Sequence, residues 1–249
     1  TALYQYQYTS SGPKGSSYDY ARNAVVPEVY LQAMYKNERF QAGVGLDILT
    51  LKPRQEYEWG VKDQNGNPVL DNNGEQVKAA FKCKEDMLVS FTPNVFASYK
   101  GDKWGVKGRV TYAQNAGHLS MISGYAVTKI KDNGEQEYSS LRSIGGWFDI
   151  TYKQRLKTGF LTWCWFAGYT KNLGCSDDIV GDIYMRGEKN MDYMFRVAPS
   201  VLFTHNAMSI GIEYNGTTVA YGTPDSKYKV SDTHSVINHR ICAMLRYNF

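Results

Sequence analysis

A two-residue alternation of apolar and polar side chains is the feature that most constrains the fold of this chain. Apolar residues occupy every second position on both sides of four short polar turns, near 36–38, 100–102, 153–155 and 205–206. A period of two indicates β-strands that have one apolar face. The pattern therefore predicts an all-β chain built from long antiparallel hairpins.

The connections between these hairpins are much longer than the turns within them. They fall near 10–27, 53–86, 116–140, 171–190 and 216–233, and they hold the Asn-Gly pairs typical of loop tips. With a first strand at 1–9 and a last one at 241–249, we count about ten strands. The segment 156–169 is apolar at both parities, so its faces stay unassigned. We expect one domain over residues 1–249, either a complete barrel or the C-terminal part of a larger one.

Charged side chains avoid the apolar face of the strands. On the strands whose parity can be read, the apolar face carries no Asp, Glu, Lys or Arg, while the other face carries small residues mixed with charged ones. The charged residues of that second face are Glu28, Asp47, Lys107, Arg109, Asp149, Arg196, Glu213, Arg240 and Arg246. A soluble β-sandwich or lectin-like domain would also keep charge off one face, so this asymmetry alone leaves two fold classes open.

Strand length and aromatic placement favour a membrane protein. The strands run for about 9 to 14 residues, whereas soluble strands cluster near 5 or 6 and a tilted strand needs about 9 to 11 to cross a bilayer. Aromatic residues of the apolar face lie beside the short turns, as in the interfacial girdles of membrane barrels. The predicted girdle comprises Tyr35, Phe40, Tyr99, Trp104, Tyr152 and Phe203, with Tyr247 beside it. We predict an antiparallel, up-and-down transmembrane β-barrel with short periplasmic turns and long extracellular loops.

The end of the chain, ICAMLRYNF, resembles the C-terminal assembly signal of bacterial outer-membrane proteins, carried here by Tyr247 and Phe249. The stretches LYQYQYTSSGPKGSS and RNAVVPEVYLQAMY, with the LKP at 51–53, resemble the distal part of DcaP-like trimeric porins of Gram-negative bacteria. This resemblance implies a trimer in the bacterial outer membrane, in contact with lipid and lipopolysaccharide and assembled by the barrel-assembly machinery. It also implies about sixteen strands, of which about six would precede Thr1.

The predicted function is that of a porin, a water-filled diffusion channel for small hydrophilic solutes. The charged face would line the channel, either simply keeping the interior wet or forming a basic rail for anionic solutes. That rail would consist of Lys107, Arg109, Arg196, Arg240 and Arg246. Because the predicted lining has five basic and four acidic residues, we expect only a mild preference for anions. The segment 53–86 would either constrict the channel mouth or form an exposed surface loop.

Other function classes find little support in the sequence. The net charge of +4 is scattered along the chain, so we expect no nucleic-acid partner. The longest apolar run, at 158–170, is too short for a transmembrane helix. The cysteines and histidines show no metal-binding spacing, and we expect no cofactor. His118 lies in a loop without an obvious Asp or Ser partner.

Two alternatives to a porin stay open. One is an outer-membrane barrel with a plugged interior, whose surface loops bind or adhere to a partner. The other is a barrel hydrolase whose catalytic residues come together from distant loops, although we expect that the protein is not an enzyme. Cys83 and Cys175 lie in long loops where a disulfide could form, whereas Cys164 and Cys242 are expected to pack within strands.

Overall fold

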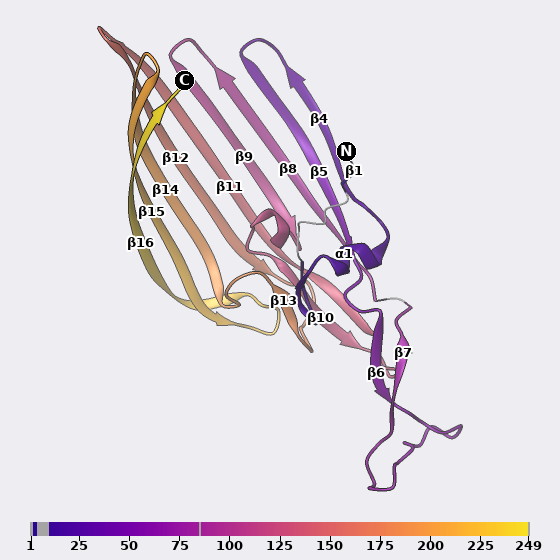
Figure 1. Cartoon of the computed structure of the whole chain (residues 1–249). Helices are drawn as coiled ribbons and strands as arrows, with labels where there is room; N and C mark the ends of the chain where they lie inside the picture. Colours follow the sequence, from indigo (N-terminus) through magenta and orange to yellow (C-terminus); the bar gives the residue numbers. More distant parts are fainter. Residues whose placement is uncertain (1, 4–9, 85, 249) are drawn as a thin grey trace.

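The computed structural model describes residues 2–3, 10–84 and 86–248, and it is dominated by antiparallel β-structure (Figure 1). The secondary-structure elements are β1 Ala2–Leu3, β2 Ser10–Gly12, β3 Gly15–Ser17, α1 Asp19–Ala24, β4 Glu28–Lys36, β5 Phe40–Leu51, β6 Glu56–Gly60, β7 Lys78–Lys82, β8 Leu88–Lys100, β9 Trp104–Gln114, η1 Gly117–Leu119, β10 Gly124–Ile130, β11 Gln136–Leu156, β12 Gly159–Gly174, β13 Ile183–Met185, β14 Met191–His205, β15 Met208–Pro224 and β16 Val230–Tyr247. The prediction of an all-β chain with long hairpins is confirmed.

One large antiparallel sheet runs in the order β1-β4-β5-β8-β9-β11-β12-β14-β15-β16, with β10 paired to β11 and β13 paired to β10. From β4 onward, each long strand pairs with the next long strand of the chain, which gives an up-and-down meander. The predicted strand at 1–9 lies mostly outside the described residues; its part at β1 pairs with β4. The turn predicted at 153–155 was placed wrongly, because β11 continues to Leu156 and pairs there with Gly159. The positive φ of Gly159, 139°, accommodates that later turn.

The register brings the apolar positions of neighbouring strands onto one face. Val95 of β8, for example, pairs with Val44 of β5 and with Val110 of β9. The same alignment resolves the faces of β12, since Trp163 pairs with Tyr152 and Val201, and Trp165 pairs with Ile150 and Pro199. The odd-numbered residues of β12 between 161 and 169 therefore join the apolar face.

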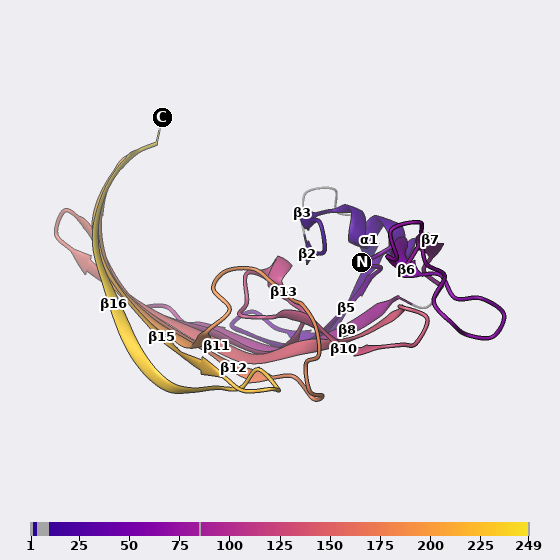
Figure 2. The same ribbon diagram turned by 90° about the horizontal axis from the view of Figure 1, so that it is seen from below.

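The sheet is bent into an open trough, and α1 lies over its concave side (Figure 2). Tyr20 of α1 packs against Leu49 and Leu51 of β5, whose parity is opposite to that of the exposed Val44, so the exposed apolar face is the convex one. The β2–β3 hairpin lies over the concave side as well.

Burial is inverted relative to a soluble domain: along β8, Val89, Phe91 and Val95 are exposed, whereas Ser90 and Asn94 on the concave face are buried. Among the described residues β16 pairs with β15 alone, so closure of the sheet into a barrel stays a prediction.

The buried apolar cores are small and lie where the long loops meet the sheet. One core joins Tyr20 of α1 to Leu49, Leu51, Leu88 and Tyr125. The other core groups Ala126, Leu141, Cys175 and Tyr228. Most apolar side chains of the long strands belong to neither core and lie on the exposed convex face.

The connection between β5 and β8 forms an arm. Its β6–β7 hairpin projects away from the sheet (Figure 1), so it does not lie over the concave face as a constricting loop would. None of the helices among the described residues is both long and apolar enough to cross a membrane.

Candidate functional site

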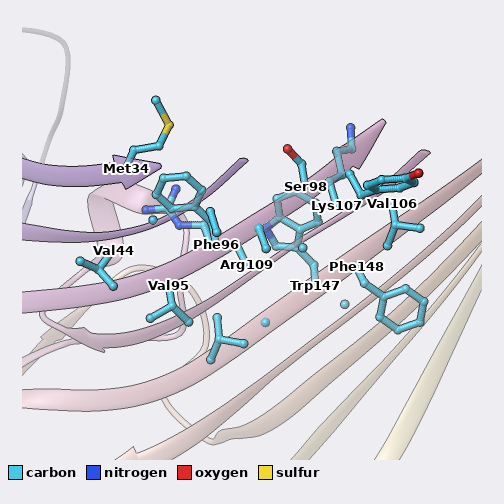
Figure 3. Close-up of a pocket in the computed structure, with 18 of the residues that line it drawn as sticks. Met34, Val44, Val95, Phe96, Ser98, Val106, Lys107, Arg109, Trp147 and Phe148 are labelled. Carbon is cyan, nitrogen blue, oxygen red and sulfur yellow. The ribbon is translucent and has the colours of Figure 1, made fainter. Parts of the chain in front are cut away.

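The concave face of the sheet is the candidate site, because the structure gathers the predicted channel-lining charges there. Several of these side chains lie opposite other polar residues across the strands, as Asp149 does opposite Lys107 and Asp47 does opposite Thr92. Figure 3 shows the division at the centre of the sheet: Ser98, Lys107 and Arg109 point to one side, and Val44 and Val95 point to the other. Their role in a channel stays a prediction.

The predicted girdle residues lie on the convex face beside the short turns. Phe40 pairs with Tyr99, and the ring of Trp104 lies 4.5 Å from that of Tyr152. Trp165 of β12 extends this aromatic group, with its ring 6.5 Å from that of Trp104. Sequence reasoning missed Trp163 and Trp165 because both parities of β12 are apolar, and only the register tells them apart. Phe203 pairs with Ile210 on the same face, whereas Phe249 lies outside the described residues.

A hollow of about 440 Å³ opens on the concave face between the strands and the loop that carries η1. Arg109 of β9 and Arg196 of β14 both line it, together with Leu119 and Met121 of the loop. A Cβ atom on Gly145 would lie 3.0 Å from the Met121 side chain, so a glycine at that position leaves room for the loop to come close. The loop that narrows the concave space is therefore the β9–β10 connection, whereas the sequence had pointed to 53–86 as either a constricting loop or an exposed surface loop.

Charge is unevenly distributed over the predicted basic rail. Nζ of Lys107 lies 3.8 Å from Oδ1 of Asp149, which offsets part of its charge. Nε of Arg109 is buried and has no hydrogen-bond partner among the described residues. Arg240 and Arg246 lie on β16 and do not line the hollow; Nε of Arg246 donates a hydrogen bond to Asn248 at 2.9 Å. The structure thus brings together Arg109 and Arg196, with Lys107 near Arg109, rather than a five-residue rail.

His118 of η1 meets two of the predicted lining carboxylates. Its Nε2 atom lies 3.0 Å from Oε1 of Glu28 and 3.5 Å from Oδ2 of Asp47. Burial lowers the pKa of His118, but hydrogen bonds and charges from Asp47 and Glu28 outweigh burial and raise that pKa to about 9. This corrects the expectation that His118 has no acidic partner. No sequence spacing could have found the cluster, because Glu28 is 90 residues away along the chain.

A buried ion pair fixes the base of the arm. Arg54 donates through Nε to Oδ2 of Asp86 at 2.8 Å and through Nη2 to the carbonyl of Gly134 at 3.2 Å. Asp86 is fully buried and also accepts the backbone N–H of Gln136. The arm is thereby tied to the start of β11.

The disulfide considered between Cys83 and Cys175 is absent, since the described cysteines are all free thiols. Cys83 lies at the base of the arm, where its backbone N–H donates to Gln55, whereas Cys175 belongs to the core around Tyr228. Cys83 and Cys175 therefore pack in two different parts of the structure.

Comparisons with protein-family models, with curated proteins and with solved structures found no match to this chain. The inference of function therefore depends on the residues and on the geometry described above.

Proposed function

We propose that this chain forms the wall of an outer-membrane porin, a water-filled channel for small hydrophilic solutes with a mild preference for anions. The proposed location is the bacterial outer membrane, with the convex face against lipid and lipopolysaccharide. The inverted burial of the sheet is the observation that carries this proposal. Apolar side chains such as Val95 and Ile212 are about half exposed, at 53% each, while the polar Asn94 and Asp47 are buried.

Exposure of the apolar convex face to water is unfavourable, and contact of that face with lipid would remove this cost. Soluble monomers expose apolar patches of only a few hundred Å², and larger ones mark contacts with partners or membranes. Within lipid every backbone N–H and C=O must be paired, so the edge of β16 that has no partner among the described residues requires a strand beside it. We propose that the sheet closes into a barrel in the membrane, with assembly by the barrel-assembly machinery and association into trimers.

The hollow beside Arg109 and Arg196 supports transport rather than a packed interior. It combines about 440 Å³ of space with two guanidinium groups, a combination that favours hydrated anions over neutral solutes. The main alternative, a plugged barrel with adhesive loops, is favoured by one observation: α1 and the η1 loop lie over the concave face.

Reconstitution of the full-length protein separates the candidates. We expect stepwise conductance increases in a planar bilayer and entry of small sugars into swelling liposomes. A plugged barrel would insert into vesicles without either effect. A hydrolase would cleave lipid or peptide reporters without conducting. Solubility of the folded chain without detergent would contradict every membrane proposal made here.

A further inference from the structure

The cluster of Glu28, Asp47 and His118 has the composition of a transition-metal site. The three side chains come from β4, from β5 and from the loop between β9 and β10, so the fold alone brings them together. Their candidate ligand atoms all lie within 4.8 Å of one another. Imidazole nitrogen and carboxylate oxygen are the ligands that Zn²⁺ takes together in many proteins.

The separations within the cluster suit a single small cation. With metal–ligand bonds of about 2.1 Å, two ligand atoms of a tetrahedral site lie about 3.4 Å apart. The observed separations from His118 Nε2, 3.0 Å to Glu28 and 3.5 Å to Asp47, bracket that value. All three ligand atoms lie within 4.8 Å of one another, so side-chain rotations would suffice to place them around one ion, with a fourth position left for water.

Asp47 supplies an independent reason to expect a cation. Its side chain is 8% exposed, and its buried Oδ2 atom has no well-formed hydrogen bond among the described residues, with His118 Nε2 3.5 Å away. A buried carboxylate oxygen without a hydrogen bond is costly unless a positive charge compensates it. Even a protonated His118 would balance only one of the two carboxylates in this enclosed space, whereas a divalent cation would balance both.

We propose that Glu28, Asp47 and His118 bind a divalent transition-metal ion of the Zn²⁺ class. The ion would bond to Nε2 of His118 and to one oxygen from each carboxylate. It would thereby cross-link the β9–β10 loop to strands β4 and β5 and hold that loop over the concave face. The site goes beyond the proposed porin function, and it would bind metal equally if the barrel were plugged.

Binding of Zn²⁺ alone to the detergent-solubilised full-length protein tests the site, measured by isothermal titration calorimetry. We expect one Zn²⁺ per chain. Substitution His118→Ala should weaken that binding by more than about 100-fold, since even the loss of an outer-shell partner of a metal ligand costs 10- to 100-fold. Glu28→Gln and Asp47→Asn keep the side-chain shape and should each weaken binding by at least tenfold.

A histidine far from the cluster provides the control. His234→Ala, at an exposed position on β16, should leave Zn²⁺ binding unchanged. No Zn²⁺ binding by the wild-type chain, or binding that His118→Ala retains and His234→Ala loses, would overturn the proposal.

X-ray absorption of the Zn²⁺-loaded wild-type chain decides the matter even if a variant fails to fold. We expect only nitrogen and oxygen scatterers near 2.0–2.2 Å. A sulfur scatterer near 2.3 Å would place the ion on one of the free cysteines and would refute this site.

Discussion

Lys107 and Asp149 face each other across β9 and β11 on the concave face, with Nζ of Lys107 3.8 Å from Oδ1 of Asp149. The neighbouring Arg109 has no such carboxylate opposite it, because its cross-strand partners are Phe96 and Trp147. If the concave face lines a channel, Arg109 should therefore contribute more uncompensated charge to selectivity than Lys107.

Charge variants of these residues test that conclusion. A unit charge about 5 Å from a passing ion in water changes its energy by about 0.8 kcal/mol, equivalent to roughly fourfold in permeability. Arg109→Ala should lower the permeability of anions and raise that of cations by about that factor each, so the anion-to-cation permeability ratio should fall by up to about sixteenfold, and Asp149→Asn should raise it. The double variant Lys107→Met, Asp149→Leu removes both charges and should leave the ratio nearly unchanged. Reversal potentials in salt gradients measure the ratio; unchanged selectivity in Arg109→Ala would count against the channel lining.

Placing charge on the convex face should impair insertion into lipid. Ile241 on that face is 72% exposed, and Met244 on the concave face of the same strand is 45% exposed. We expect Ile241→Arg to make folding into vesicles less favourable by about 2–4 kcal/mol, the cost of Arg near the middle of a bilayer. Met244→Arg is the matched control and should cost about 1 kcal/mol or less. Urea titrations in lipid vesicles give both values; equal costs would contradict the assignment of the two faces.

Breaking the ion pair at the base of the arm should release the arm from the sheet. Asp86→Ala leaves Arg54 only 15% exposed and without its carboxylate, which costs about 3–5 kcal/mol for a buried pair. Hydrogen exchange at the amides of Gly134 and Gln136 should therefore accelerate. Replacing both partners, as Arg54→Met with Asp86→Leu, should restore much of the protection at Gly134, but not at Gln136, whose N–H loses its acceptor in both variants. Unchanged exchange at Gly134 in Asp86→Ala would show that the pair does not fasten the arm.

Cys83 should be a poorly reactive thiol. Burial, followed by its hydrogen bond with Asp86, raises the pKa of Cys83 to about 12 from an ordinary value of 9.0. Because the thiolate is the nucleophile, alkylation of the folded chain near pH 8 should be about a thousandfold slower than that of the unfolded chain. The rate should keep rising with pH beyond 10. A variant with Cys83 as the sole cysteine isolates this rate by mass spectrometry, and a rate that levels off near pH 9 would contradict the environment described for this thiol.

The sequence predicted the faces of most strands because a period of two is a local property. The structure confirms the opposite faces of Val95 and Asn94, and the placement of Tyr35 and Phe40 beside a short turn on the apolar face. Where both parities are apolar, as on β12, the local pattern carries no information. Only hydrogen-bonded neighbours then assign Trp163 and Trp165 to the convex face.

Contacts between distant loops could not be predicted from the sequence. His118 reaches Glu28 because the β9–β10 loop folds back over the sheet, and loop paths depend on tertiary packing rather than on local periodicity. The same limit explains why 53–86 stayed open between a constricting loop and an exposed surface loop. Its length was visible in the sequence, but the direction in which β6 and β7 project was not.

Lipid and water accessibility along β8 tests the central claim most directly. Single spin labels at successive positions 91–98, in the protein reconstituted into vesicles, report collisions with lipid-soluble oxygen and with a water-soluble nickel complex. We predict alternation, with odd positions such as Phe91 and Val95 accessible to oxygen, and even positions such as Phe96 and Ser98 accessible to the nickel complex rather than to oxygen. Equal access of the nickel complex to both sets of positions would contradict a convex face embedded in lipid.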